Sequence, residues 1–254
     1  MTKFSVNLNK IALLRNSRGR NVPDVAAVAR RCLASGAHGI TVHPRPDQRH
    51  TRYTDVLELA RVVREFPGAE FNVEGNPTEQ FIALVLEAKP DQVTLVPDAA
   101  DQLTSDHGWD VLGDGAVLAA VLPRFKAAGI RTSLFMDPDV KQIEALPALQ
   151  ADRIELYTES YANAYGSPDE AAVLAAFAAA ATVARAQQLG VNAGHDLSLY
   201  NLATFLASVP EVLEVSIGHA VVCEALDLGL EPTIQRYLAI VNTASSAASA
   251  GPRT

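Results

Sequence analysis

The stretch Gly39-Ile40-Thr41-Val42-His43-Pro44-Arg45 decides the fold that we expect for this chain. Its opening residues form a short run of apolar and β-branched side chains, which is typical of a buried strand. The run ends in His43 and Arg45, and a pattern with the period of a helix follows at Thr54–Glu65. A strand that leads through reactive side chains into a helix is the repeating unit of a parallel α/β fold.

The same unit recurs along the chain. Strand-like runs lie at Phe4–Leu8, Gly39–Val42, Glu70–Val73, Gln92–Val96, Arg131–Phe135, Arg153–Tyr157, Val191–Ala193 and Leu213–Ile217. Helical patterns separate these runs, so we predict parallel strands joined by right-handed crossovers. Short strands that are apolar on both faces favour a closed (β/α)8 TIM barrel over an open doubly wound sheet. The length of 254 residues suits such a barrel, which needs about 250.

No linker divides the sequence, so we expect a single barrel domain over residues 1–244. Within it, Leu230–Ala244 is one helix more than eight units require, which predicts a barrel with extra helices. Residues 245–254 are small and polar, and we expect them to form a frayed C-terminal tail.

The composition excludes several classes of function. A formal net charge of −8 argues against a nucleic-acid binder but leaves small anionic ligands open. The first ten residues lack the apolar stretch of a signal peptide, and the longest uncharged apolar run, Ala171–Ala184, is too short to span a bilayer. Cys32 and Cys223 lie in apolar helical patterns without metal-ligand spacing, so we expect two buried free thiols. These features predict a cytoplasmic enzyme with no membrane partner.

Reactive side chains follow most of the predicted strands, at the edge where a TIM barrel places its active site. In chain order they are Asn7, Asn9, Lys10, His43, Arg45, Arg49, His50, Glu74, Asp98, Thr104, Asp106, His107, His195 and His219. Helix starts also attract polar residues, and we expect Asp137, before a proline, to be a helix cap rather than a catalyst.

His43, Glu74 and His195 form a plausible acid/base set, because histidine titrates near neutral pH and a buried glutamate can be tuned towards it. Glu155 lies inside the sixth strand, on the face opposite Ile154. A carboxylate inside a barrel is costly unless it is paired or functional, although Glu155 could instead face a helix. A metal site is the competing explanation for the same ring of residues. We expect none, because HxH and HxxxH spacings are missing and basic neighbours would repel a cation.

Two groups of basic residues follow the first two predicted strands and indicate an anion-binding arc. They are Arg15 and Arg18, then Arg45, Arg49, His50 and Arg52. Glycines 194 and 218 follow the last two strands, where backbone N–H groups can approach a phosphate. Two anion sites around proton-transfer groups suggest the joining of two phosphorylated small molecules.

With these residues in place, the sequence resembles the pyridoxine 5′-phosphate synthase family of the deoxyxylulose-dependent vitamin B6 pathway. The matching segments are Asn7-Leu8-Asn9-Lys10-Ile11-Ala12, Leu14-Arg15-Asn16-Ser17-Arg18-Gly19, Gly39-Ile40-Thr41-Val42-His43-Pro44-Arg45, Arg49-His50, Asn72-Val73-Glu74, Leu95-Val96-Pro97, Ser133-Leu134-Phe135, Ile154-Glu155-Leu156, Asn192-Ala193-Gly194-His195 and Ile217-Gly218-His219-Ala220. They occur in the family's order over nearly the whole chain.

The resemblance implies condensation of 3-amino-2-oxopropyl phosphate with 1-deoxy-D-xylulose 5-phosphate to give pyridoxine 5′-phosphate, phosphate and water. It implies that His43 and Glu74 accept protons, that His195 donates one, and that Glu155 stabilises a transition state. The residues implied to hold the amino-ketone phosphate are Asn7, Arg18, Asp196, Gly218 and His219. Those implied to hold deoxyxylulose phosphate are Asn9, Lys10, Arg45, His50 and Thr104. The resemblance also implies no metal or organic cofactor and a homo-octamer built from dimers.

Two departures from the family pattern stand out. The family commonly has Asp-His where this chain has Asn9-Lys10, and Lys10 could bind substrate or form a transient imine with a ketone. Asp196 replaces a common glycine, so we expect it to contact phosphate through its backbone N–H. The long loop Asp98–Asp110 is a candidate lid. Two alternatives stay open at this point: another phosphate-binding isomerase or aldolase barrel that uses Lys10, or a non-catalytic ligand-binding barrel.

Overall fold

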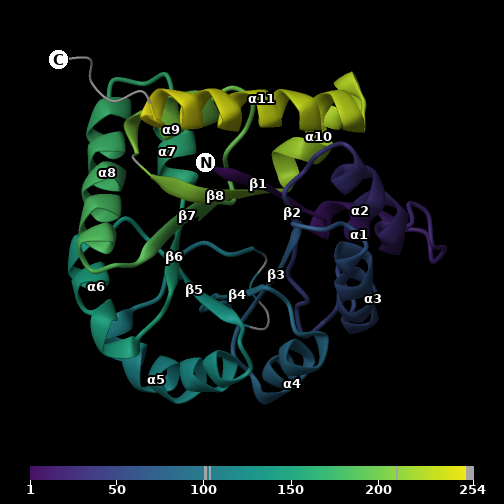
Figure 1. Cartoon of the computed structure of the whole chain (residues 1–254), viewed down its shortest axis with the longest axis horizontal. Coiled ribbons are helices and arrows are strands. Elements are labelled where there is room, and N and C mark those ends of the chain that lie inside the picture. The colour runs from purple at the N-terminus through teal and green to yellow at the C-terminus, as the bar shows by residue number, and fades with distance from the viewer. Residues whose placement is uncertain (100–101, 103, 210, 250–254) are drawn as a thin grey trace.

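The computed structural model describes residues 1–99, 102, 104–209 and 211–249. The eight strands close into a parallel barrel in which each strand pairs with its sequence neighbours and β1 pairs with β8 (Figure 1). The strands are β1 (Lys3–Asn7), β2 (Gly39–Val42), β3 (Glu70–Gly75), β4 (Gln92–Leu95), β5 (Arg131–Met136), β6 (Arg153–Tyr157), β7 (Gly190–Gly194) and β8 (Val212–Ile217). The predicted TIM barrel is confirmed, with every strand end within about two residues of its expected position.

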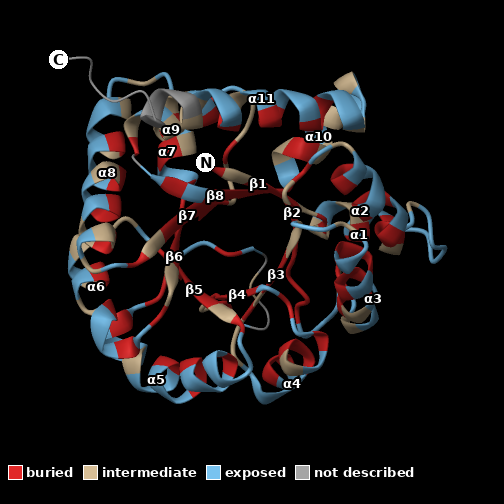
Figure 2. Ribbon diagram, in the orientation of Figure 1, coloured by how far each residue is buried: buried red, intermediate tan, exposed pale blue. Residues whose placement is uncertain are grey.

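Helices surround the barrel, and each buries one face against it while the other face meets solvent (Figure 2). They are α1 (Asn9–Asn16), α2 (Val25–Ala34), α3 (Tyr53–Arg64), α4 (Glu79–Ala88), α5 (Val111–Ala127), α6 (Val140–Glu144), the 3-10 turn η1 (Leu146–Leu149), α7 (Glu159–Ala164), α8 (Glu170–Ala186), α9 (Leu202–Ser208), α10 (His219–Leu228) and α11 (Leu230–Ser249). Within the described residues, every helix is too short or too polar to cross a lipid bilayer.

Local sequence explains where several helices begin. The side chains of Asp24 and Thr78 accept hydrogen bonds from the backbone N–H groups of Ala27 and Phe81, which caps α2 and α4. The sequence suggested Asp137 as the cap of the helix after β5. In the structure the N-cap of this helix, α6, is Asp139. Asp137 instead accepts a hydrogen bond of 3.0 Å from the backbone N–H of Gly108, so it holds the loop that follows β4.

Two other expectations differ from the structure. Cys32 is a buried free thiol as predicted, but Cys223 is exposed, because it lies on the solvent side of α10. Helix α11 continues to Ser249, so residues 245–249 of the expected frayed tail are helical, and residues 250–254 lie outside the described residues. In Figure 1, α11 runs along the top of the view, in the ring of helices outside β1 and β8, beside α10 and α9.

The interior of the barrel is polar and hydrogen-bonded across the strands. The Thr94 hydroxyl donates to Asn72 Oδ1 at 3.1 Å, and Asn192 Nδ2 donates to Gln92 Oε1 at 3.4 Å. The apolar core lies instead between the barrel and its helices. This division matters for function, because a polar interior accepts a carboxylate such as Glu155 at the level of the pocket.

Candidate active site

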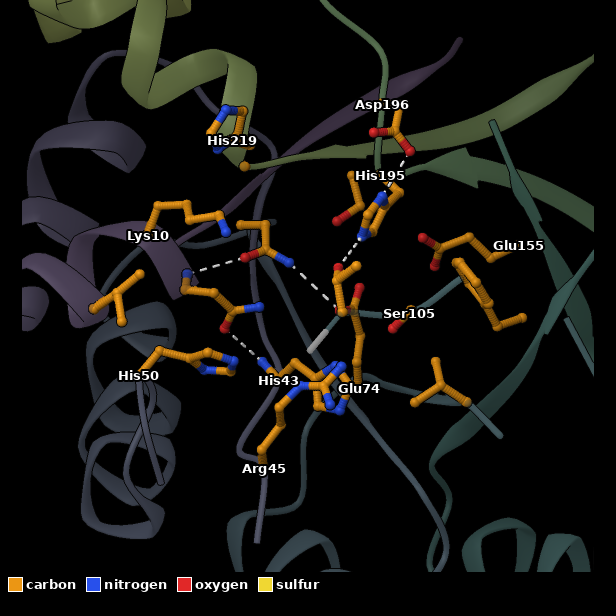
Figure 3. Close-up of a pocket in the computed structure, with 18 of the residues that line it drawn as sticks. Lys10, His43, Arg45, His50, Glu74, Ser105, Glu155, His195, Asp196 and His219 are labelled. Atoms are coloured by element: carbon orange, nitrogen blue, oxygen red, sulfur yellow. Dashed lines mark hydrogen bonds and ion pairs between the residues drawn. The ribbon is translucent and has the colours of Figure 1, made fainter. Parts of the chain in front are cut away.

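A cavity of about 440 Å³ opens at the carboxyl ends of the strands. It is lined by every catalytic or substrate-binding residue that the family resemblance implies except Arg18: Asn7, Asn9, Lys10, His43, Arg45, His50, Glu74, Thr104, Glu155, His195, Asp196, Gly218 and His219. In Figure 3, Lys10 and His50 enter the cavity from one side and Glu155 from the other, with Glu74 and His43 between them. The strand-end residues therefore converge on one site.

Two carboxyl groups lie inside this cavity. Burial, together with the negative charges of Asp98 and Glu214, raises the pKa of Glu74 to about 7, although the neighbouring His195 lowers it. Burial and the charge of Glu74 raise the pKa of Glu155 well above its ordinary value. Two carboxyls that interact in this way share a proton at neutral pH, and the more buried Glu155 is the one that holds it. Glu74 is then the member of the pair that is free to accept a proton.

Gly194 makes room for Glu155. A Cβ atom at position 194 would lie 2.5 Å from Glu155 Oε1 and 2.8 Å from the backbone oxygen of Ser216. Both distances are shorter than a non-bonded carbon–oxygen contact, so a side chain larger than hydrogen would displace the carboxyl group. The glycine that ends β7 is thus required by the geometry of the acid inside the barrel.

A hydrogen bond from its backbone N–H fixes the position of His43. Its N–H donates to Asn9 Oδ1 at 2.8 Å, and the Thr51 hydroxyl donates to the same oxygen at 2.9 Å. Burial and the positive charges of Arg45, His50, His195 and Arg49 lower the pKa of His43 well below its ordinary value. The imidazole is therefore neutral at physiological pH and can act as a base.

His195 has the opposite electrostatic environment. Its Nδ1 lies 2.6 Å from Asp196 Oδ2, and its Nε2 lies 3.1 Å from the Thr104 hydroxyl. Burial lowers the pKa of His195, but the Asp196 hydrogen bond and the charges of Asp196, Glu74 and Asp98 raise it by more, so the net shift is upward. A histidine that favours its protonated form is suited to donate a proton. His195 also has φ of 89°, a strained conformation that the packing must enforce.

The basic side of the cavity is partly neutralised by the protein. Arg45 forms a buried ion pair with Asp98 and donates to the Gln102 carbonyl at 2.7 Å, and Arg49 pairs with Asp47. Lys10 also lines the cavity, and within the part of the chain that the structure describes it has no carboxylate partner. Burial, Arg45, Arg49 and Lys10 together lower the pKa of His50 to about 4, against a raising effect of Asp47. Among the described residues, Lys10 is thus a cation on this side of the cavity that an incoming anion meets without a carboxylate partner.

Several sequence predictions for this region are not met as stated. Arg15 was grouped with Arg18 as an anion-binding arc, but Arg15 is 2% exposed and forms a double hydrogen bond with Asp55, at 2.6 and 2.8 Å. It is a structural residue. Arg18 is exposed and lies outside the cavity lining. The backbone N–H of Asp196, which we expected to face phosphate, donates to the Thr158 hydroxyl at 3.2 Å.

Sequence reasoning also missed residues that line the cavity. These are Leu13, Val96, Ser105, Phe135 and Ser216. Ser216 and Phe135 lie on β8 and β5, where strand periodicity could have placed them on the inner face. Ser105 lies in the loop after β4, where nothing local indicates that its hydroxyl reaches Asp98 at 2.7 Å.

Within the described ranges, no three His, Cys, Asp or Glu side chains are grouped so as to hold a metal ion. What the cavity does hold is two groups suited to accept protons, Glu74 and His43, one suited to donate a proton, His195, and a basic rim. A closed (β/α)8 barrel with such a cavity at the carboxyl ends of its strands belongs to the class of barrel enzymes that work by acid/base chemistry on anionic small molecules.

Comparison with known proteins identifies the family within that class. The family model described as "Pyridoxal phosphate biosynthesis protein PdxJ" matches residues 4–243, and the chain belongs to this family. A relative from Xanthomonas campestris pv. campestris (strain B100), named pyridoxine 5′-phosphate synthase, is 57% identical over 94% of this chain and 96% of the relative. A relative of the same name from Bacteroides fragilis (strain YCH46) is 55% identical over 93% of this chain and 98% of its own length. The family predicted from the sequence is confirmed, as is the expectation of an enzyme.

Solved structures extend the likeness at the level of fold alone. Tryptophan synthase from M. tuberculosis, in its open form, superposes with a TM-score of 0.64 and 14% identity, over 94% of this chain and 92% of that one. An identity this low shows a shared barrel and nothing about the chemistry of the pocket.

Proposed function

We propose that this chain joins 3-amino-2-oxopropyl phosphate to 1-deoxy-D-xylulose 5-phosphate and releases pyridoxine 5′-phosphate, phosphate and water, which is the reaction of a pyridoxine 5′-phosphate synthase. The observation that carries the proposal is the set of opposed pKa shifts in one cavity: Glu74 raised to about 7, His43 lowered and His195 raised. A condensation with loss of water, loss of phosphate and ring closure moves a proton at every step. It therefore needs both bases and an acid around one substrate.

The roles follow from these protonation states. Glu74 and the neutral His43 accept protons from the substrate, and His195, kept protonated by Asp196, donates one to a leaving oxygen. Glu155 keeps its proton and serves as a hydrogen-bond donor, which stabilises negative charge that develops on a substrate oxygen in the transition state. The hydroxyl of Thr94, 3.4 Å from Glu155 Oε2, supports the position of this carboxyl.

The two phosphates are assigned to opposite sides of the cavity. On the side of α1 and the loop after β2, Lys10, Arg45 and His50 receive deoxyxylulose phosphate together with Asn9 and Thr104. On the side of α10, Gly218 is the N-cap residue and His219 the first helical residue, so the helix N-terminus faces the amino-ketone phosphate. Asn7, which packs against Gly218, and Asp196 complete this second subsite.

We extend the proposal to the state of the protein. The chain acts as one barrel domain in the cytoplasm, without a metal or organic cofactor. Eight copies of the chain form a homo-octamer that is built from dimers. Arg18 lies outside the cavity lining of its own chain, and its contact with the amino-ketone phosphate is part of the proposal. Light scattering of the purified protein tests the octamer, which has a mass of about eight times 27.0 kDa.

Turnover with the purified protein tests the function. The two phosphorylated substrates are mixed with the protein, and pyridoxine 5′-phosphate is quantified by its fluorescence after chromatography, with released phosphate measured in parallel. We expect equal amounts of both products. No product from a folded protein that binds both substrates would refute the proposal. Treatment with borohydride and the ketone phosphate checks the role of Lys10, because an imine-forming lysine would be trapped as a stable adduct.

A further inference from the structure

Asp98 has no role in the function proposed above, yet it is a buried charge that contacts two residues of the cavity lining, Arg45 and Ser105. It lies in the loop after β4 and is 5% exposed. Its Oδ2 accepts hydrogen bonds from the Arg45 guanidinium and, at 2.7 Å, from the Ser105 hydroxyl. Its other oxygen, Oδ1, is buried without a hydrogen-bond partner among the described residues. A buried carboxylate oxygen left unsatisfied is rare and needs a reason.

This carboxylate lies close to an imidazole as well as to the Arg45 guanidinium. Asp98 Oδ2 lies 4.0 Å from His43 Nε2, and the side chains of both residues are less than a tenth exposed. At that separation a carboxylate and a protonated imidazole attract each other strongly, because the surrounding protein screens them poorly. A neutral imidazole gains little from the same contact. The pair is therefore arranged so that it strengthens when His43 takes up a proton.

The other groups around His43 make such a partner necessary. Arg45, Arg49 and His50 face it from the loop after β2, and His195 faces it from the end of β7; all of these act against a positive charge on the ring. The carboxylates near it are Glu74 on β3 and Asp98. Glu74 titrates near neutral pH and takes up protons itself, whereas Asp98 is fixed by two donors. Asp98, which Arg45 also engages, is therefore the second carboxylate within reach of the ring.

We propose that Asp98 is a positioning residue that makes His43 an effective base, by stabilising the imidazolium that forms when His43 removes a proton from the substrate. The proton passes to the ring, the bonding electron pair stays on the substrate, and the ring–carboxylate pair holds the charge until the proton is returned. The inference rests on the proposed function, because it assigns a partner to the base of that reaction. It does not require Asp98 to touch the substrate.

Asp98 also anchors the loop through Ser105, and the test must separate the two effects. Asp98→Asn removes the charge and keeps the size of the side chain, and Asp98→Glu keeps the charge. Ser105→Ala is the matched control, because it removes the loop hydrogen bond and leaves the carboxylate in place. If charge is what matters, Asp98→Glu recovers a substantial part of the activity that Asp98→Asn loses.

The decisive measurement is a double-mutant cycle on kcat with His43→Gln. We expect Asp98→Asn to lower kcat about 10- to 100-fold in the parent while KM for each substrate changes less than about threefold, since only a charge formed during turnover is affected. In the His43→Gln background the same change costs less than about twofold. We expect Ser105→Ala to lower kcat much less than Asp98→Asn does.

Two results would overturn the inference. One is an equal loss from Asp98→Asn in both backgrounds, which shows that it acts independently of His43. The other is a loss confined to KM, which shows that Asp98 serves binding through Arg45, and this second measurement stands even if His43→Gln is too slow to follow. A parent protein that makes no pyridoxine 5′-phosphate is a different outcome, because it refutes the proposed function itself.

Discussion

The raised pKa of Glu74 predicts a steep pH dependence of turnover. A base must be ionised to accept a proton, so kcat/KM follows the ionised fraction of Glu74 on the acid side. With a pKa of about 7, that fraction grows from about 0.03 at about pH 5.5 to about 0.24 at about pH 6.5, an increase of about eightfold. With the ordinary value of 4.5 it would grow only about 1.1-fold over the same range.

The assay measures pyridoxine 5′-phosphate at substrate concentrations below KM, over a pH range kept above the isoelectric point of about 5.2 so that the protein stays soluble. The pKa of His50 is lowered to about 4, below this range, and burial and the surrounding positive charges lower the pKa of His43 in the same direction. His195 stays largely protonated, since its pKa is raised, and its loss of a proton gives the alkaline limb of a bell-shaped profile.

Two substitutions check the assignment of the acid limb. Glu74→Gln keeps the shape and removes the base, so we expect turnover to fall at least about a hundredfold with little change in phosphate-ligand affinity. Glu155→Gln imitates the protonated carboxyl that Glu155 presents at neutral pH, so the midpoint of the acid limb moves by less than about half a pH unit. A flat kcat/KM between about pH 5.5 and about pH 6.5, or a fully active Glu74→Gln variant, would refute the reasoning.

Three further predictions concern other parts of the chain. Asp55→Asn leaves Arg15 buried without its counter-charge and lowers the melting temperature by about 10 °C, corresponding to about 3–5 kcal/mol, which differential scanning fluorimetry detects; an unchanged melting temperature contradicts the structural role. Gly194→Ala pushes Glu155 out of place and lowers kcat at least about tenfold while the protein stays folded by circular dichroism, and full activity would count against the contact. Cys223 is exposed, so a thiol reagent modifies one cysteine per native chain and both after denaturation; two reactive thiols in the native protein would contradict this.

The barrel could be predicted because its signal is local. Each strand is a short apolar run followed by a helix, and strand ends such as Asn7, His43, Glu74 and His195 come together in any closed barrel with parallel strands. That these side chains gather at one edge follows from the topology alone. The position of Glu155 inside the barrel was likewise indicated by the alternation of side chains along β6.

Partners far apart in the sequence could not be predicted. Arg15 has the same composition signal as Arg18, and only the fold shows that Asp55, forty positions later, neutralises it. The sequence likewise indicates that Arg45 is a free cation, because its partner lies far away along the chain. In the structure Arg45 forms an ion pair with Asp98. Cys223 lies in an apolar helix, but which face of α10 meets solvent depends on the neighbouring helices.

Contacts in the structure explain how Asn9-Lys10 can stand where the family commonly has Asp-His. Asn9 uses its side-chain oxygen to hold the backbone N–H of His43 and the Thr51 hydroxyl, and an amide oxygen accepts both bonds as well as a carboxylate would. An aspartate there would add a negative charge beside His43, which already has Asp98 within 4.0 Å. Asparagine keeps the hydrogen bonds without that charge. Lys10 then restores positive charge on the side of the cavity where Asp98 and Asp47 engage the two arginines. The pair therefore shifts the balance of charge towards anion binding while the contacts that position His43 are retained.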